Sequence, residues 1–247
     1  MSAERRLLAA LLAAGLLGPA ATAAAAPVVQ SMVVGRGGQV LSAARSIAAT
    51  ATSVTVAGRT CSIAAATPLA VLADLRAGGG PGFALRDYGH CGGASTASSS
   101  QLFVYSLGGE ANRGQDGWEY KVGGAAGSTG AADPSGVSGN GRLVQSGERV
   151  LWFWCEATAS GCERTLEVSA TGGAVHGKPL TAAVYGYDNN GRGSPVAGAV
   201  VTLGSGRAVT GPHGRATLTA PSARGRYRLT ATRAGMVPSF PVTIAVG

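Results

Sequence analysis

The sequence is poor in charged, aromatic and histidine side chains. Only 13% of its 247 residues are charged, 5% are aromatic, and it holds three histidines. A typical globular domain carries about 25% charged residues. After the first 26 residues, no run reaches the roughly 18 apolar residues that a membrane-spanning helix needs. These shortages exclude a coiled coil and a polytopic membrane protein, and they leave few side chains for acid–base catalysis.

The chain begins with the pattern of a secretory signal peptide. Arg5 and Arg6 precede an apolar run at residues 7–17, and small residues then lead to Pro27. A charged start, a short apolar stretch and a small-residue cleavage zone are typical of such a peptide. We therefore expect residues 1–26 to be removed. The mature protein is then secreted or associated with the cell envelope, with no transmembrane segment after cleavage.

Export makes disulfides the expected state of the four cysteines, Cys61, Cys91, Cys155 and Cys162. Three pairings are possible. We favour Cys155–Cys162, because one predicted strand ends at the first and another begins just after the second; Cys61–Cys91 follows by elimination. A zinc site is the alternative, but the spacings contain no Cys-x2–4-Cys pair. We expect no metal and no cofactor.

Charge divides the mature chain into two modules. Residues 27–171 hold ten Lys or Arg and ten Asp or Glu, whereas residues 172–247 hold eight Lys or Arg against Asp188 alone. All four cysteines and all three tryptophans lie in the first module. We predict the boundary between residues 171 and 172.

The first module shows the pattern of an α+β domain. Two runs, Thr52–Val56 and Arg59–Ile63, flank a two-residue turn and predict a hairpin. Thr67 and Pro68 predict a helix start, and Gly78 predicts its end. One short helix among several strands is typical of this class. Further strands are expected at residues 102–107, 118–122, 150–154 and 164–168.

Three segments of this module resemble motifs of one family. Residues 116–124, Asp-Gly-Trp-Glu-Tyr-Lys-Val-Gly-Gly, resemble the Gly-Trp-x-Tyr-x-Val-Asn-Gly segment of the transcobalamin-like C-terminal domain family, DUF4430. Residues 67–75 resemble its Thr-x-Leu-x-Ala-Leu helix, and residues 146–154 its x-Gly-Asp-x-Val-x-Trp-x-Tyr strand. The resemblance implies a β-grasp-like fold. The chain departs from the family at Gly123-Gly124, and it has no room for the separate helical domain beside which family members bind cobalamin.

The second module alternates short strands with Gly- and Pro-rich turns, which is typical of a small β-sandwich. Residues 195–246 resemble carboxypeptidase regulatory-like and bacterial Ig-like modules in their Pro-Val-x-Gly-Ala-x-Val and Gly-x-Tyr-x-Leu motifs. The resemblance implies an Ig-like or prealbumin-like sandwich, similar to carbohydrate-binding-like folds, with a non-catalytic accessory role. The expected fold class is therefore mainly β: an N-terminal α+β β-grasp-like domain followed by a small β-sandwich.

Four aromatic residues are the best candidates for a ligand site. Trp118 and Tyr120 share one face of a predicted strand, and Trp152 and Trp154 share a face of another. If exposed, this set would stack on sugar rings or on a planar ligand. The alternative, which we favour, is core packing in a module with few other large side chains.

Basic residues mark a second candidate surface. Arg224, Arg226 and Arg228 alternate along one predicted strand, and Arg233 follows it. In an exported protein this surface would meet anionic cell-wall polymers, glycans or envelope proteins. No pattern of a nucleic-acid-binding fold occurs, so we expect no nucleic acid. The alternative is a solvated surface without a specific partner.

No set of residues predicts catalysis. His90 lies beside Cys91, but the expected disulfide leaves no thiolate for nucleophilic attack. Asp116 and Glu119 are a possible carboxylate pair, yet Glu119 should point away from the face of Trp118 and Tyr120. We therefore expect a non-enzymatic binding or interaction protein of the cell envelope. A secreted carrier of a corrinoid-like small ligand and an envelope hydrolase are the alternatives.

Overall fold

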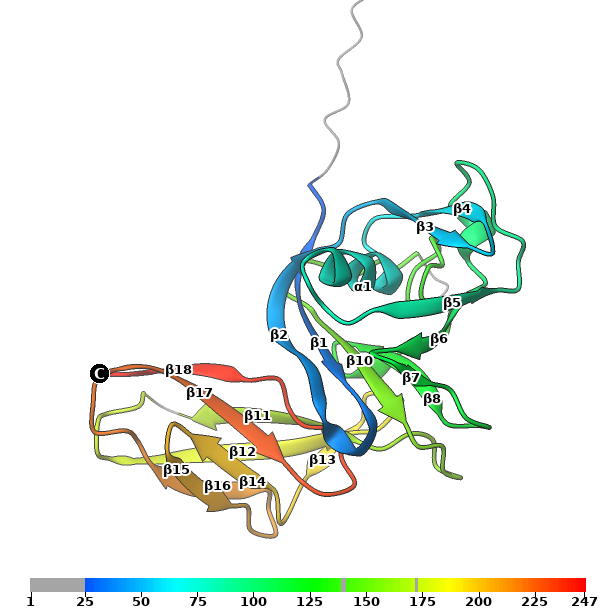
Figure 1. Ribbon diagram of the computed structural model, residues 1–247. Helices are drawn as coiled ribbons and strands as arrows, with labels where there is room; N and C mark the ends of the chain where they lie inside the picture. The colour runs from blue at the N-terminus through cyan, green and yellow to red at the C-terminus, as the bar shows by residue number, and fades with distance from the viewer. Residues whose placement is uncertain (1–24, 139–140, 172) are drawn as a thin grey trace, which may run out of the picture.

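The computed structural model describes residues 25–138, 141–171 and 173–247 (Figure 1). Over these residues the chain is mainly β, as the sequence predicts, with eighteen strands, one α-helix and two short 3-10 helices. The predicted signal peptide lies outside the described residues except for its last two. In the described ranges, no helix is both long and apolar enough to cross a membrane.

A five-stranded mixed sheet forms the centre of the N-terminal part. Its order is β2-β1-β10-β8-β9, and β1 runs parallel to β10 while the other neighbours are antiparallel. The strands are β1 Val28–Val34, β2 Val40–Ala48, β8 Gly117–Val122, β9 Ala125–Ala126 and β10 Arg149–Cys155. The sequence pattern does not predict β1 and β2, because small and polar residues interrupt their apolar positions.

Helix α1, Pro68–Ala77, packs against this sheet beside β1 and β2 (Figure 1). The Thr67 side chain caps the helix by accepting a hydrogen bond from the Ala70 N–H at 3.3 Å. This cap satisfies one of the free N–H groups of the first turn. The predicted helix is confirmed at both ends. Three of its leucines are wholly buried against the sheet: Leu69, Leu72 and Leu75.

Two smaller sheets complete the N-terminal part. The predicted hairpin pairs β3, Thr52–Val56, with β4, Arg59–Ile63. The 3-10 helices Arg36–Gly38 and Ala97–Ser99 lie in loops. Buried residues of the sheets and of α1 form one hydrophobic core. The second small sheet has the order β5-β6-β7, with β5 Phe83–Asp87, β6 Leu102–Leu107 and β7 Glu110–Ala111.

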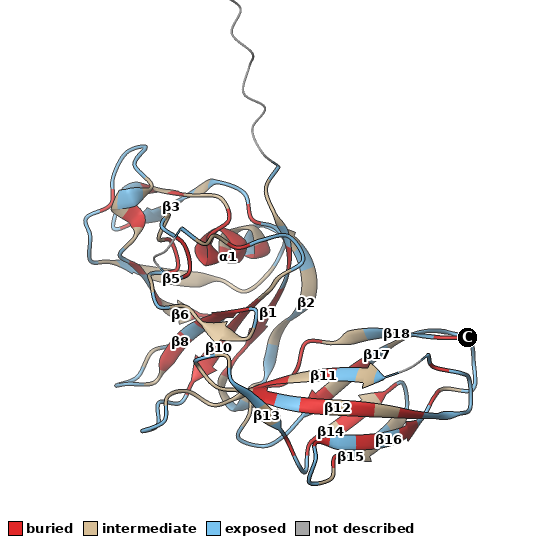
Figure 2. Cartoon of the chain, turned by 180° about the vertical axis from the view of Figure 1, so that it is seen from behind, coloured by how far each residue is buried: buried red, intermediate tan, exposed pale blue. Residues whose placement is uncertain are grey.

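Two four-stranded antiparallel sheets make up the C-terminal part. One joins β11, β12, β13 and β16, and the other has the order β15-β14-β17-β18. Val, Leu and Ala side chains of both sheets form a second core, and Figure 2 shows its buried positions in red along β12. The strands are β11 Thr165–Thr171, β12 Pro179–Tyr187, β13 Gly193–Pro195, β14 Val200–Leu203, β15 Gly206–Val209, β16 Arg215–Thr219, β17 Gly225–Thr232 and β18 Val242–Val246.

Strand β11 differs from the prediction in its partners. The sequence pattern favours the first module for a strand at residues 164–168. In the structure, β11 pairs with β12 over seven residues, and Leu166 and Val168 are buried in the second core. The expected placement was wrong because alternating apolar residues specify that a strand has a buried face, but not which sheet covers that face.

The two parts meet along the face of the central sheet opposite α1. Lys121 of β8 is 1% exposed at this junction, and its ammonium donates to the carbonyl oxygens of Tyr187 and Asp188, both at 3.0 Å, and to Thr165 Oγ1 at 3.3 Å. Burial lowers the pKa of Lys121 to about 8. A third cluster of buried residues joins β1 and β10 to the loop after β17: Met32, Val34, Leu151, Phe153, Cys155, Val237 and Phe240.

Candidate functional site

The four aromatic candidates lie in the N-terminal core. Their exposed fractions range from 1% to 5%. Tyr120 and Trp152 are cross-strand neighbours with ring centroids 5.5 Å apart, and Trp118 and Trp154 form a T-shaped pair at 5.8 Å. The predicted sharing of strand faces is therefore confirmed, but these faces point inward. The core packing that we favour is confirmed, and the four rings do not form an exposed row, since they fill this core.

Both predicted disulfides, Cys61–Cys91 and Cys155–Cys162, are formed. Cys155 is the last residue of β10, and Cys162 lies shortly before β11. The pairing inferred from the strand ends is thus confirmed. The described residues contain no free cysteine.

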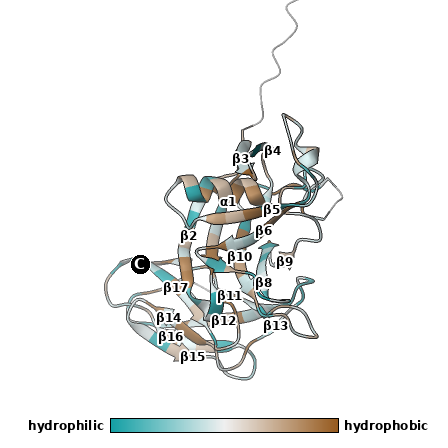
Figure 3. Cartoon of the chain, turned by 45° about the vertical axis from the view of Figure 1, so that its right-hand side comes forward, coloured by the Kyte–Doolittle hydropathy of each residue, from teal (hydrophilic) through white to brown (hydrophobic). Residues whose placement is uncertain are grey.

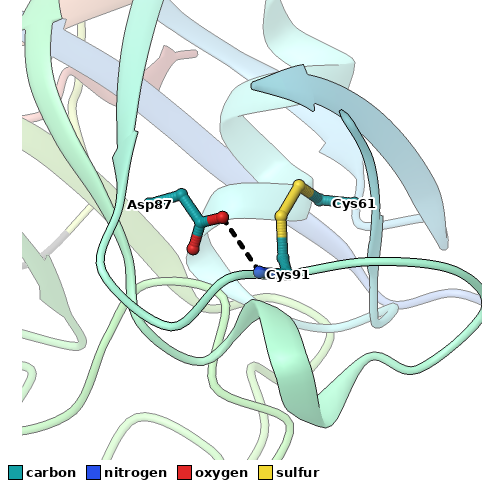
Figure 4. A group of neighbouring side chains, drawn as sticks. All are labelled: Cys61, Asp87 and Cys91. Atoms are coloured by element: carbon teal, nitrogen blue, oxygen red, sulfur yellow. Dashed lines mark hydrogen bonds between the residues drawn. A yellow bond between two sulfur atoms is a disulfide. The ribbon is translucent and has the colours of Figure 1, made fainter. Parts of the chain in front are cut away.

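An aspartate lies beside the first disulfide (Figure 4). A carboxylate oxygen of Asp87 and the sulfur atoms of Cys61 and Cys91 lie within 4.8 Å of one another. The Asp87 carboxylate accepts hydrogen bonds from the N–H groups of Cys91 at 2.9 Å and Gly89 at 3.0 Å, and from the Arg59 guanidinium at 2.8 Å. Because the sulfur atoms are bonded to each other, neither is a thiolate ligand or nucleophile. The cluster orders its loop.

The two carboxylates considered for catalysis have different surroundings. Glu119 is exposed on β8 and faces away from the buried Trp118 and Tyr120, as predicted. Asp116 precedes β8, and its Oδ1 accepts a hydrogen bond from the Ala157 N–H at 2.9 Å. This hydrogen bond gives Asp116 a role in holding the loop after β10.

Arginines and threonines gather on the outward face of the sheet β15-β14-β17-β18. Directly paired residues of antiparallel strands share a face, as do alternate residues of one strand. On the inward face of the same sheet, Leu203, Leu229 and Ala231 are wholly buried, which fixes the direction of their neighbours. We call the outward surface the Arg–Thr face and define it by seven residues: Thr202, Arg207, Arg226, Arg228, Thr230, Thr232 and Thr243.

The four predicted basic residues are all exposed. Arg226 and Arg228 lie on the Arg–Thr face, whereas Arg224 precedes β17 and Arg233 follows it. Arg207 belongs to the same face but was not among the predicted residues. Its pairing with Thr202 across the β14–β15 hairpin places it on this face, and that pairing follows from the structure.

The Arg–Thr face carries unbalanced positive charge. Its three arginines form no ion pair and no side-chain hydrogen bond with other described residues. Asp188, the one acidic residue after position 171, lies in the turn after β12. Its carboxylate accepts hydrogen bonds from the backbone N–H groups of Arg192 and Asn190, both at 2.9 Å, and these bonds lower its pKa. Glu167 of β11, the other acidic side chain of the C-terminal part, forms an ion pair with Arg149 at 3.7 Å. Neither of these two carboxylates forms an ion pair with an arginine of the face.

A cavity of about 260 Å³ adjoins the Arg–Thr face where β17 meets β2. Arg228, Thr230 and Thr232 line one side of it. Apolar residues of β1, β2 and the loop before β18 line the other side, and Val40 among them is 48% exposed. The face is thus open over its strands and hollowed at the junction between the two parts.

Comparison with known proteins finds no matching family model and no matching curated protein. What the surface can bind follows from its own side chains. Guanidinium groups donate paired hydrogen bonds to phosphate or carboxylate oxygens, and threonine hydroxyls add single donors or acceptors. The Arg–Thr face is therefore suited to an anionic ligand that extends over several strands.

Proposed function

We propose that this chain is an exported, non-enzymatic binding protein of the cell envelope, and that its Arg–Thr face binds an anionic surface polymer. The observation that carries the proposal is the gathering of three unpaired arginines among threonines on one open sheet face. Charged side chains without partners remain fully available to a ligand. A polymer that contacts several of them at once gains affinity from each contact.

The geometry of the face favours a linear polymer over a small enclosed ligand. Arg226 and Arg228 are alternate residues of β17, so their Cα atoms lie about 7 Å apart. Arg207 lies two strands away on β15, which adds about 10 Å across the sheet. Repeating phosphate or carboxylate groups span the whole set of three arginines, whereas one small anion is held by Arg226 and Arg228 at most and leaves Arg207 without a partner. The partner is therefore a polyanion with charges on successive units.

The rest of the chain supports an envelope location and a binding role. Two disulfides suit an oxidising compartment outside the cytoplasm. The N-terminal sheet order β2-β1-β10-β8, with α1 on one face, is consistent with the β-grasp-like fold that the family resemblance implies. In this arrangement the C-terminal part contacts the surface polymer, and the N-terminal part is displayed beside it.

The test is binding of the chain from Pro27 onward to immobilised polymers. The probes are a teichoic acid, which carries phosphodiesters, a polygalacturonate, which carries carboxylates, and neutral dextran. We expect salt-sensitive binding to at least one polyanion and none to dextran. Replacing Arg207, Arg226 and Arg228 together by Gln is expected to weaken binding at least about tenfold, because each lost arginine removes charge-assisted hydrogen bonds.

A second triple variant is the matched control. Lys178, Arg192 and Arg215 are exposed residues of the C-terminal part outside the Arg–Thr face. Replacing these three by Gln removes the same formal charge, so this variant is expected to retain most of the binding. Equal losses in the two variants would show attraction by net charge alone and would contradict a defined face. Absence of binding to both polyanions would overturn the proposed function.

A further inference from the structure

A groove of about 560 Å³ lies in the N-terminal part between β3, β5 and the C-terminal half of α1. Val54, Phe83 and Leu85 line it, are partly buried, and pack against the N-terminal core. Figure 3 shows the hydrophobic (brown) stretch of β5 beside α1. The groove therefore combines an apolar lining with access from solvent, and it is separate from the Arg–Thr face.

One wall of the groove is a free strand edge. β3 pairs with β4 on one side only. The hairpin has a two-residue turn with Val56 opposite Arg59, so hydrogen-bonded and non-hydrogen-bonded pairs alternate from that point. The N–H and C=O groups of Ser53 and Thr55 consequently point away from β4. Within the described residues, they have no hydrogen-bond partner.

The opposite wall is a second free edge. β5 pairs with β6 only. The Gly108 N–H donates to the Gly82 carbonyl at 2.7 Å, which makes Phe83 and Leu107 a non-hydrogen-bonded pair. The backbone groups of Phe83 therefore point away from β6, and they too lack a partner in the described part of the chain. Natural proteins usually pair or cover such edges, because an exposed edge recruits another strand.

A cation lies on the same groove. Arg76 of α1 lines it and is exposed, and its guanidinium makes no ion pair or hydrogen bond with other described residues. The neighbouring carboxylates are already engaged: Asp74 accepts hydrogen bonds from Thr50 at 2.8 Å and 2.6 Å, and Asp87 forms an ion pair with Arg59 at 2.8 Å. The groove thus offers one positive charge without a counter-ion.

We propose that this groove binds an extended peptide segment of a partner protein, which adds to β3 as a further strand and places a carboxylate against Arg76. Backbone N–H and C=O groups of the peptide match those of Ser53 and Thr55. Its alternate side chains enter the apolar lining, as in other strand-addition complexes. A glutamate or aspartate in the segment meets Arg76. The site is independent of the proposed polymer binding.

The test uses defined peptides and the chain from Pro27 onward. The probes are blocked, fluorescein-labelled heptapeptides of Thr and Val in which a single Glu occupies the third, fourth or fifth position. We expect saturable anisotropy changes with at least one peptide. Amide shifts at Ser53 and Thr55 in heteronuclear NMR spectra are expected to accompany binding. Alternate N-methylation of the peptide backbone is expected to weaken binding about tenfold or more, because it removes the donors that pair with β3.

Two variants at Thr55 separate edge pairing from side-chain contact. Thr55→Pro removes an N–H that the β3–β4 ladder does not use, so the hairpin is expected to persist while binding is lost. Thr55→Val keeps the backbone donor and is expected to bind like the original chain. Circular dichroism and thermal unfolding of both variants check that the fold is intact. A heptapeptide with Gln in place of the Glu serves as the uncharged comparison. Arg76→Gln is expected to abolish the preference of the original chain for the Glu peptide over this Gln peptide.

Three results would overturn the proposal. The first is absence of saturable binding by all the peptides. The second is binding that Thr55→Pro leaves unchanged while the fold is intact. The third is self-association of the original chain, measured by light scattering, that Thr55→Pro abolishes, since the occupant of the edge would then be a second copy. None of these results bears on the Arg–Thr face, so failure of this proposal and failure of the polymer proposal are distinguishable.

Discussion

The N-terminal and C-terminal parts of the chain reach their cores by different means. The N-terminal core contains all three tryptophans, the only α-helix of the described residues, and a disulfide. The C-terminal core consists of Val, Leu and Ala between two regular sheets, without a cysteine. A core of small side chains needs regular hairpins that pack closely, whereas large rings and cross-links stabilise irregular loops. The regular part is also the part with an ordered, charged outer face.

Removal of a large ring from the N-terminal core is expected to have the largest effect. Trp152 is 1% exposed, so Trp152→Ala leaves a cavity and is expected to lower the free energy of unfolding by about 3–5 kcal/mol. Ala231, wholly buried in the C-terminal core, gives a contrasting case, since Ala231→Gly removes one methyl group and is expected to cost about 1–2 kcal/mol. Urea denaturation measures both. Equal costs would contradict the difference between the cores.

Loss of the disulfides is expected to destabilise the N-terminal part next most strongly. The Cys61–Cys91 cross-link spans 30 residues and Cys155–Cys162 spans 7. In the chain-entropy model they contribute about 3.7 and about 2.5 kcal/mol, respectively. Replacing each pair by Ala and measuring unfolding by tryptophan fluorescence tests this order. A larger loss from the shorter loop would contradict the entropic explanation.

The buried lysine between the two parts is expected to make stability depend on pH. Its folded pKa is about 8 and its ordinary value is 10.5, so the unfolded chain binds more protons between these values. The free energy of unfolding therefore rises with pH across this window, by about 3 kcal/mol for this group. Urea denaturation of the original chain and of Lys121→Met, from about pH 7.5 to 10.5, isolates the contribution. Parallel pH curves for the two proteins would contradict it.

The smallest effect on stability is expected from the Arg–Thr face. Arg228 is exposed and forms no ion pair with other described residues, so Arg228→Gln is expected to change the free energy of unfolding by less than about 0.5 kcal/mol. Thermal unfolding measures the change. A loss above about 1 kcal/mol would show that the arginine supports the sheet and is not held free for a ligand.

Local signals account for the elements that the sequence predicts well. The capping Thr67 and Pro68 define the start of α1, and the turn between β3 and β4 defines the register of that hairpin. The partner of a strand is not a local property. The parallel pairing of β1 with β10 places Gln30 opposite Arg149, and the position of β11 in the second core depends on its pairing with β12. Sequence patterns predict neither of these pairings. The alternation of apolar residues shows that a strand has a buried face, but not which other element covers that face.

The Arg–Thr face was predictable only in part, because the sequence shows which residues alternate along one strand but not which strands lie side by side. The alternation of Arg226 and Arg228 along β17 is visible in the sequence, and their exposure is confirmed. Arg207 joins them only through β14, which lies between β15 and β17. The groove at β3 and β5 could not be predicted at all, since it depends on two hairpins that leave facing edges unpaired. For the four aromatic residues, the shared strand faces and the favoured core packing are both confirmed.

The parallel pairing of β1 with β10 also determines when the N-terminal part can fold. Gln30 lies opposite Arg149, so the first strand has no inner neighbour until about 120 further residues have been made. Before that, the Val28–Val34 edge is open and apolar, and the chain is at risk of pairing with itself or with other chains. The C-terminal sheets consist largely of hairpins, in which each strand pairs with the next strand along the chain. Their formation therefore does not wait for a distant segment. We therefore expect refolding to proceed in two stages, with the C-terminal part formed before the central sheet closes.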